Sequence, residues 1–237
     1  MPEPLATVGV DVWGWEGQAQ HMGELAAEWL SEFLGRPAVL ARQLNAVERP
    51  TAGPLVVDGR QLETGGDQVS FADGFPYLMT SMQSLAQVNQ WIASNSSEPQ
   101  APLTMRRFRP NIVVSGEDNR AFAEDSWRVI RFSRLALDRS AALVTRLYNQ
   151  KICGRCVLTT VDPDQGKFAP CAKDPHGVLK SVPEPLHCLR RNRQRDNGEA
   201  YFGVNLVGDL HSFGKLLCVG DITEVEAVGQ VGRDIDL

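Results

Sequence analysis

The chain has 237 residues, of which 43% are hydrophobic and 22% charged, and its formal net charge is −5. This composition is typical of a globular protein and excludes a disordered or collagen-like chain. The acidic balance disfavours a protein that binds nucleic acid through a diffuse positive surface. No apolar run approaches the roughly 18 residues of a membrane-spanning helix, and the first residues lack the charged segment of a signal peptide. We therefore expect a soluble chain with no membrane segment and no nucleic-acid partner.

The five cysteines are an odd number in a chain with an ordinary share of core residues, unlike the cysteines of a disulfide-stapled secreted module. Cys153 and Cys156 form one tight pair in the sequence CGRC, and the other three are scattered. This usage favours a reducing compartment, in which the thiols are free or bound to a metal.

The first part of the chain contains one strand pattern and one helix pattern. Residues 8–13 predict a short strand, and apolar side chains at intervals of three and four predict a helix over residues 25–34. Gly35 and Pro37 follow that pattern, as expected at a helix end. Residues 47–66 are polar and rich in proline and glycine, which is typical of a loop or of a connection between subdomains.

A second helix pattern follows the turn-rich segment 71–77. Thr80 and Gln83 have the spacing of a capping box, and four apolar residues nearby lie on one helical face. These residues are Met82, Leu85, Val88 and Ile92. Downstream, β-branched or alternating runs predict strands at residues 112–114, 127–132, 157–161 and 216–225, with a turn at residues 162–166. Together these elements predict a mixed α+β fold with a β-barrel-like core and a few flanking helices.

The CGRC segment has several interpretations, which its spacing alone does not separate. A thioredoxin-like redox pair opens a helix, whereas residues 157–161 favour a strand. A structural zinc site needs two further ligands, and the sequence offers four candidates. They are Cys171, His176, His187 and Cys188. The pair can also be two small buried hydrophobic residues, or it can supply one thiolate to a soft transition metal, with Arg155 favouring the deprotonated sulfur.

Arg109 and Asn111 stand two residues apart at the entry to a predicted strand, where alternate side chains share a face. A guanidinium and an amide on one face suit a large polar heterocycle or a phosphate, although a basic edge exposed to solvent has the same pattern. Asp73 lies in the turn before the second helix, where an Asx-turn is the simpler interpretation. The basic run at residues 190–195 is either a solvated face or the rim of an anionic pocket. No nucleophile-elbow or phosphate-loop motif supports a hydrolase or an NTPase.

Taken in order, seven segments resemble the MOSC domain of the mitochondrial amidoxime-reducing component family, which includes similar bacterial and plant proteins. They are FADGFPYLMTSMQSL (71–85), FRPNIVVSG (108–116), FAEDSW (122–127), CGRCVLTTVDPDQG (153–166), EPL (184–186), FGVNL (202–206) and VGD (219–221). The stretches VWGW and AAEWLSEFLGRP also resemble the segment that precedes this domain in eukaryotic members. We therefore expect residues 1–46 to be a remnant of the N-terminal β-barrel subdomain, residues 47–229 to be the MOSC domain and residues 230–237 to be a C-terminal tail.

The resemblance implies a molybdenum cofactor, in which the dithiolene of a pterin holds a molybdenum atom. In this family the second cysteine of the corresponding segment supplies the protein thiolate, and here that residue is Cys156, whereas Cys153 matches a cysteine position without a metal bond. A soft thiolate suits a metal that cycles through two-electron oxidation states with oxo ligands. The resemblance also implies which other residues contact the cofactor. They are Asp73, Gly74, Arg109, Asn111, Gly154 and Arg155.

By the same resemblance, the chain is an enzyme, a molybdenum-dependent oxidoreductase that reduces small N-hydroxylated substrates such as amidoximes. The expected partners are a small b-type haem cytochrome and its NADH-dependent flavin reductase. The alternatives are a non-catalytic module that binds or carries the molybdenum cofactor, and the MOSC domain of a cofactor sulfurase. The resemblance leaves both a cytoplasmic and a mitochondria-associated location open.

The sequence departs from the family pattern in three places. Family members usually begin with a β-rich part that supplies a Lys-Ser pair and an arginine to the pterin phosphate, and we expect this chain to start after it. Residues 139–150 look like an insertion, which the spacing of their apolar side chains places on a short helix. Residues 169–183 lengthen the loop before EPL.

Overall fold

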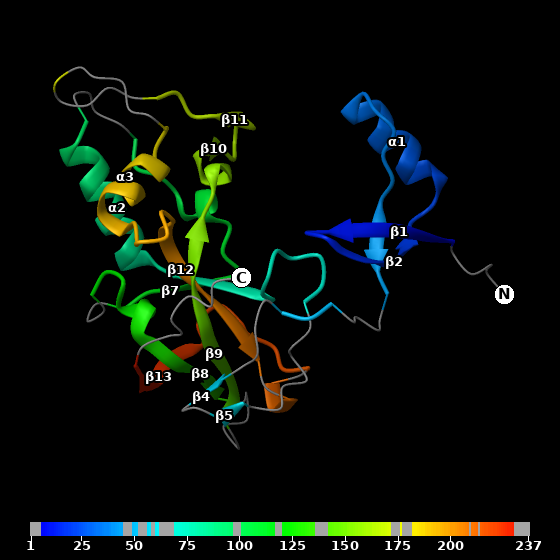
Figure 1. The fold of residues 1–237 in the computed structure, drawn as a ribbon. Helices are drawn as coiled ribbons and strands as arrows, with labels where there is room; N and C mark the ends of the chain where they lie inside the picture. Colours follow the sequence, from blue (N-terminus) through cyan, green and yellow to red (C-terminus); the bar gives the residue numbers. More distant parts are fainter. Residues whose placement is uncertain are drawn as a thin grey trace. The chain divides into compact units, whose positions relative to one another are not determined.

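The computed structural model describes residues 6–44, 49–51, 56–57, 60–61, 69–96, 101–116, 120–135, 142–171, 176, 182–208, 210–212 and 214–229. The chain forms two compact units (Figure 1). One unit comprises Met1–Gly53 and Asp67–Pro76, and the other comprises Pro54–Gly66 and Tyr77–Leu237.

The first unit is a three-stranded antiparallel sheet with one helix. In sheet order, the strands are β1 (Thr7–Val12), β2 (Trp15–His21) and β3 (Ala41–Gln43). Helix α1 (Glu24–Leu34) connects β2 to β3. It ends at Gly35, whose φ of 65° lets the chain leave the helix while the Arg36 N–H donates to the Ser31 carbonyl. The strand and the helix predicted for this region are confirmed.

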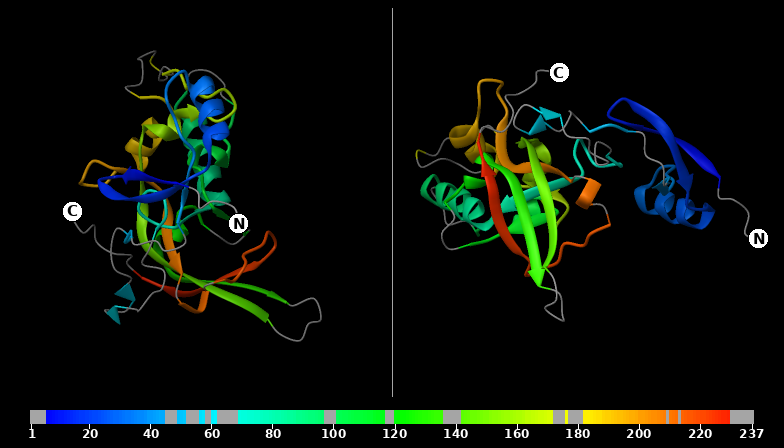
Figure 2. Two further views of the ribbon diagram at one scale, coloured as in Figure 1. Left: turned by 90° about the vertical axis from the view of Figure 1, so that its right-hand side faces the viewer. Right: turned by 90° about the horizontal axis from the view of Figure 1, so that it is seen from below.

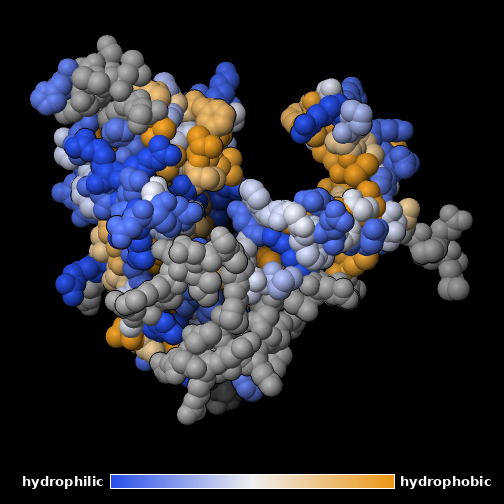
Figure 3. Space-filling model, in the orientation of Figure 1, coloured by the Kyte–Doolittle hydropathy of each residue, from blue (hydrophilic) through white to orange (hydrophobic). Residues whose placement is uncertain are grey.

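The apolar face of α1 is exposed. Leu25, Trp29 and Phe33 are 84%, 63% and 75% exposed, and the rings of Trp29 and Phe33 stack with their centroids 5.5 Å apart. Ala27, by contrast, is buried. Figure 3 shows apolar side chains in orange along this helix. The apolar periodicity therefore predicts the helix correctly, but it does not predict whether the apolar face is buried.

The second unit is built on a six-stranded sheet, which is antiparallel except for one parallel pair, β6 with β7. In sheet order, its strands are β13 (Ile222–Val228), β8 (Trp127–Leu135), β9 (Ala142–Arg155), β12 (Ala200–Gly208), β6 (Tyr77–Ser81) and β7 (Ile112–Val114). Two short antiparallel pairs accompany it, β4 (Val56–Val57) with β5 (Arg60–Gln61) and β10 (Val161–Asp162) with β11 (Lys167–Phe168). Figure 2 shows the six-stranded sheet strongly curled, like half of a barrel. The predicted α+β fold with a barrel-like core is confirmed.

The second unit has two α-helices, which pack on one face of this sheet, and four short 3₁₀ helices among its described residues. They are α2 (Met82–Ser94), α3 (Leu186–Arg193) and the short 3₁₀ helices η1 (Met105–Phe108), η2 (Ala123–Ser126), η3 (Val157–Thr160) and η4 (Leu210–Ser212). Beneath α2 and α3, the rings of Phe108 and Phe202 stack with their centroids 3.9 Å apart. A second core lies on the other face and includes Met79, Trp127 and Tyr201. The central strand β12 contributes Ala200 and Phe202 to the first core and Tyr201, Val204 and Leu206 to the second, because the register shift between Tyr201 and Val204 interrupts the alternation of its side chains.

Helix α2 begins at a different cap from the one that the capping-box spacing predicts. Ser81 is the N-cap, and its Oγ accepts a hydrogen bond from the Ser84 N–H at 3.4 Å. Thr80 is wrong as the cap because it is buried and paired with Val113 in the sheet. Gln83 instead donates to the Gly116 carbonyl at 2.6 Å.

The strand predicted over residues 157–161 is wrong for most of its length, because residues 157–160 form the 3₁₀ helix η3. The Thr159 hydroxyl donates to the Cys156 carbonyl at 3.0 Å. The Thr160 hydroxyl donates to the Val157 carbonyl at 2.7 Å. These local side-chain hydrogen bonds close a helical turn in a sequence whose β-branched residues indicate a strand.

Two other elements differ from the expectation. Residues 142–150 lie in β9 rather than in a short helix, because β8 and β12 supply hydrogen-bonding partners on both sides. The strand predicted over residues 216–225 begins only at Ile222, since the Asp221 carboxylate accepts the Cys218 N–H at 2.8 Å and closes a turn before it. Residues 139–141 and most of the loop 169–183 lie outside the described residues. None of the described helices is long and apolar enough to cross a membrane.

Candidate functional site

Cys156 stands directly after β9, where the strand is followed by η3. Its backbone is still extended, with φ −95° and ψ 179°, and its side chain is exposed. All five cysteines are free thiols, so Cys153 and Cys156 form no disulfide. The interpretation of the pair as two buried hydrophobic residues does not fit, because Cys153 is half-buried and Cys156 is exposed. An accessible thiol of this kind is able to bind a metal.

Arg155 connects the end of β9 to the segment that precedes β7. Its Nη1 donates to Cys153 Sγ at 3.1 Å, and its Nη2 donates to the Phe108 carbonyl at 2.7 Å. The guanidinium also lies 5.8 Å from the centroid of the Phe108 ring. Arg155 and Cys153 share a strand face because side chains two residues apart point the same way, whereas Gly154 faces the other side. The Arg155 side chain therefore fixes the CGRC segment to residues 105–108.

A second set of contacts joins the same two regions, since η1 lies against η3. Arg107 donates to the Thr160 carbonyl at 3.1 Å and to the Asp162 carboxylate at 3.0 Å. The N–H groups of Asp164 and Gln165, followed by the guanidinium of Arg107, hold the pKa of Asp162 below its ordinary value. These bonds also confirm the predicted turn at residues 162–166, in which Asp162 is the turn-forming acid.

Arg109 and Asn111 follow η1 directly and are both exposed. Arg109 has a left-handed backbone, with φ 55°, and its N–H donates to the Arg106 carbonyl at 3.2 Å. Asn111 pairs with Leu78 through its side-chain oxygen at 2.8 Å and its backbone N–H at 2.9 Å, which fixes the start of β7 beside β6. The Asn111 Oδ1 already accepts this hydrogen bond, and its Nδ2 hydrogens are the donors that the amide can offer to a ligand. The segment that carries both residues is the one that Arg155 holds.

Gly154 lies opposite Tyr201 in the pairing of β9 with β12. A Cβ atom at Gly154 would come within 2.7 Å of Glu199 Oε2, so glycine leaves room there for a carboxylate. The sequence analysis missed Glu199. A glycine within a strand often marks a place where another group approaches the backbone closely. Gly154 is such a glycine, but the sequence does not show which residue approaches it.

Asp73 and Gly74 belong to the first compact unit, whereas Cys156, Arg109 and Asn111 belong to the second. Within the first unit, the Asp73 carboxylate accepts the indole N–H of Trp13 at 3.2 Å. The Arg49 guanidinium donates to the Asp73 carbonyl and, at 2.9 Å, to that of Ser70. A role for Asp73 and Gly74 at the cofactor stays a prediction.

The residues named for a zinc site do not gather in the part of the chain that the structure describes. Cys188 is buried in the core beneath α2 and α3, and Cys171 lies elsewhere and is half-buried. No three His, Cys, Asp or Glu side chains among the described residues are placed to hold one metal ion. The basic run is partly used in packing, since Arg193 pairs with Asp125 and lies 4.1 Å from the centroid of the Phe122 ring.

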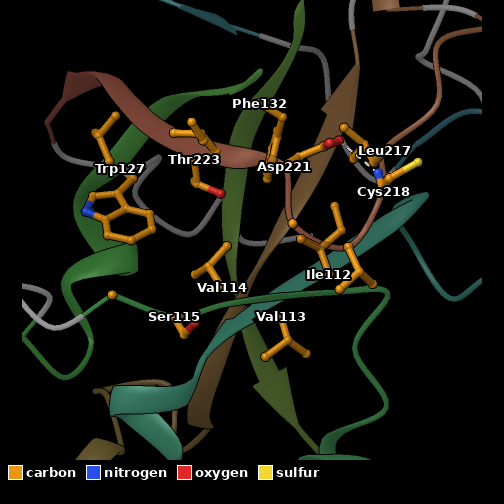
Figure 4. Close-up of a pocket in the computed structure, with 15 residues that line it drawn as sticks. Ile112, Val113, Val114, Ser115, Trp127, Phe132, Leu217, Cys218, Asp221 and Thr223 are labelled. Carbon is orange, nitrogen blue, oxygen red and sulfur yellow. Dashed lines mark hydrogen bonds between the residues drawn. The ribbon is translucent and has the colours of Figure 1, made fainter. Parts of the chain in front are cut away.

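The second unit also contains a pocket of about 570 Å³ between β7 and β13, the two border strands of the sheet. Figure 4 shows Ile112 and Val114 of β7 and Trp127 and Phe132 of β8 around it, with the Asp221 carboxylate hydrogen-bonded to Cys218. The predicted site residues are not among those that line this pocket.

Comparison with known proteins places the chain in a family. The model of the MOSC domain matches residues 66–229. The chain belongs to the MOSC domain family. The resemblance that the seven sequence segments carry is therefore confirmed.

The similar curated proteins fall into two groups. Mitochondrial amidoxime-reducing component 1 of Homo sapiens is 32% identical over 188 residues, which cover 79% of this chain and 46% of that protein. Its counterpart in Mus musculus is 32% identical over 207 residues, covering 86% and 49%. Molybdenum cofactor sulfurase of Oryza sativa subsp. japonica is 27% identical over 199 residues, covering 83% of this chain and 21% of that protein. The chain spans about half the length of the amidoxime-reducing components that it matches.

Proposed function

We propose that this MOSC protein binds the molybdenum cofactor through the Cys156 thiolate and reduces N-hydroxylated substrates such as amidoximes. One observation carries the proposal: an exposed free thiol ends β9, and Arg155 beside it holds the segment that presents Arg109 and Asn111. The printed names of the relatives, which refer to amidoxime reduction and to the molybdenum cofactor, support the choice of cofactor and reaction.

The residues present fit such a cofactor. A thiolate is a soft ligand and suits molybdenum, while a guanidinium and an amide N–H donor suit an anionic phosphate and a pterin ring. In the proposal Cys156 holds the metal, Arg109 and Asn111 bind polar groups of the pterin, and Gly154 contributes its backbone to the same site. Asp73 and Gly74 complete the set by resemblance alone. The bound cofactor would supply two-electron redox chemistry.

Arg155 has a different role in this proposal from that of a direct ligand. Its guanidinium is occupied by Cys153 Sγ and the Phe108 carbonyl. It acts by holding the Cys156 segment at a fixed position relative to Arg109. Cys153 then serves as a hydrogen-bond acceptor and not as a metal ligand.

The reaction breaks the N–O bond of the substrate: two electrons and two protons convert an amidoxime into an amidine and water. In the proposal, a small b-type haem cytochrome delivers the electrons one at a time, and an NADH-dependent flavin reductase supplies that cytochrome. We also propose the domain boundaries given above, with the MOSC domain at residues 47–229, and a mitochondria-associated location, which the names of the relatives support.

A second candidate is a cofactor-binding module without turnover, or the corresponding part of a cofactor sulfurase. The similarity to the plant sulfurase over 83% of this chain supports it. Both candidates use the same thiolate, so metal content alone does not separate them.

The test is molybdenum analysis and benzamidoxime reduction on matched variants of the purified chain, with cytochrome and reductase supplied. Cys156→Ala is expected to lose at least nine-tenths of the bound molybdenum and of the activity. Cys153→Ser, which keeps a hydrogen-bond acceptor for Arg155, is expected to retain most of the metal. Equal loss in both variants would reject Cys156 as the ligand. Metal without turnover in the unmodified chain would favour the cofactor-binding module.

A further inference from the structure

Cys156 and Glu199 each stand one residue beyond the paired ends of β9 and β12. The register of β9 with β12 pairs Gly154 with Tyr201 and Arg155 with Ala200. The extended backbone of Cys156 continues the strand geometry to this position.

A set of hydrogen bonds holds the Glu199 carboxylate over Gly154. The hydroxyl of Tyr201, a buried side chain, donates to Glu199 Oε2 at 2.9 Å. Asn197 donates from its Nδ2 to the Tyr201 oxygen at 2.7 Å and accepts the Glu199 N–H at 3.1 Å. The carboxylate thus occupies the space that a side chain at Gly154 would fill, where a Cβ atom would lie 2.7 Å from Oε2. Gly154 and Cys156 share a strand face, so this carboxylate lies on the same side of the sheet as the thiol.

The charge of Glu199 is available to a ligand at this face. Arg155 lies on the opposite strand face and donates to Cys153 and Phe108. Arg195 places its guanidinium over the Tyr201 ring, 5.1 Å from the centroid. A carboxylate beside a metal-binding thiolate repels anions and attracts N–H donors and cations. Its placement therefore favours a ligand with a cationic or amino group.

We propose that Glu199 is a specificity-determining residue, whose carboxylate binds the amino group of amidoxime-type substrates and the amidinium of their products. This inference rests on the proposed function and names the chemical group by which that site recognises its substrate. An amidinium presents two parallel N–H groups, as a guanidinium does, and such a fork matches the two oxygens of a carboxylate. An N-hydroxylated compound without an amino group gains no binding affinity from Glu199.

The test is equilibrium binding of benzamidine and of benzamide to the purified chain, measured by calorimetry before cofactor loading. The two probes have nearly the same shape, but only benzamidine is a cation at neutral pH. We expect benzamidine to bind at least tenfold more tightly than benzamide, and Glu199→Gln to abolish this preference. Gly154→Ala is expected to weaken it too, because the new methyl group displaces the carboxylate. Glu224→Gln, which removes a carboxylate on β13, is expected to leave it unchanged.

Equal binding of both probes to the unmodified chain, or a preference that survives in Glu199→Gln, overturns the proposal. Its failure is distinguishable from failure of the proposed function, because molybdenum content depends on Cys156 and not on Glu199. In the loaded enzyme, Glu199→Gln is expected to raise the KM for benzamidoxime about tenfold with molybdenum content unchanged. The KM for an N-oxide without an amino group is expected to stay the same, and a parallel rise for both substrates contradicts the assignment.

Discussion

Helices α1 and α2 both carry apolar side chains at intervals of three and four residues, but only α2 buries them. Leu85, Val88 and Ile92 of α2 are 5%, 0% and 4% exposed, in contact with the core that α3 and β12 complete. The corresponding face of α1, which contains Trp29 and Phe33, is exposed. Periodicity is a property of the helix alone, whereas burial requires a second surface of matching shape. The difference predicts that equal truncations in the two units have very different effects.

The largest effect is expected from Phe202→Ala in the core beneath α2 and α3. Phe202 is fully buried and stacks on Phe108, so its removal leaves a cavity and costs about 3–5 kcal/mol of unfolding free energy. Urea unfolding followed by circular dichroism measures this loss. A change below 1 kcal/mol would mean that this core does not stabilise the second unit.

A smaller effect is expected from Arg155→Gln, which removes the hydrogen bond that joins the CGRC segment to the Phe108 carbonyl and the one that Arg155 donates to Cys153 within the segment. Hydrogen bonds to charged groups contribute about 1.5–3 kcal/mol when buried and less at a partly exposed site, so we expect a loss of about 1–2 kcal/mol. Hydrogen exchange of residues 105–111 should accelerate in Arg155→Gln. Arg155→Lys, which keeps the charge and one donor, should recover part of the protection, and unchanged exchange in both variants would contradict the positioning role.

The buried carboxyl of Glu124, which contacts Ser84 of α2, predicts a pH dependence of the protein's stability. Glu124 is fully buried, and burial raises the pKa of its carboxyl above the ordinary value of 4.5, although the hydrogen bond from the Ser84 hydroxyl at 2.5 Å acts in the opposite direction. The folded protein therefore binds this proton more tightly than the unfolded chain. The resulting stability is complete below about pH 4.5 and is lost as the pH rises through the folded pKa.

Glu124→Gln removes that dependence while keeping a hydrogen-bonding side chain. We expect the Tm of the variant relative to the unmodified chain to increase between pH 5 and pH 8. Each unit by which the folded pKa exceeds the unfolded value corresponds to about 1.4 kcal/mol. Parallel Tm curves across this range would show that Glu124 does not titrate differently in the folded state.

The smallest effect is expected from Phe33→Ala on the exposed face of α1. Phe33 is 75% exposed and stacks only on Trp29 within its helix, so its removal should change the unfolding free energy by about 0.5 kcal/mol or less. A loss comparable with that of Phe202→Ala would show that this face is covered in solution.

The sequence predicts well the elements that a local pattern decides. Examples are α1, α2 and β7, the strand within the FRPNIVVSG segment. The errors occur where hydrogen bonds outside the periodic pattern decide the outcome. Ser81 displaces Thr80 as the cap because the parallel pairing of β6 with β7 buries Thr80. Residues 157–160 form a 3₁₀ helix because the hydroxyls of Thr159 and Thr160 bond to nearby carbonyls.

The candidate site shows the same limit. Cys156, Arg109 and Asn111 could be named from motifs that resemble a known family. Glu199 lies 43 residues beyond Cys156 in the sequence, and the pairing of β9 with β12 brings its carboxylate over Gly154 of the CGRC segment. No spacing rule along the chain expresses a cross-strand neighbour, so this residue could be found only from the fold.

The most direct test of the central claim is X-ray absorption at the molybdenum K-edge on the loaded unmodified chain and on Cys156→Ser. We expect the molybdenum in Cys156→Ser to have one sulfur neighbour fewer than in the unmodified chain, or the variant to bind no molybdenum at all. An equal amount of metal with an unchanged sulfur shell in Cys156→Ser would contradict it.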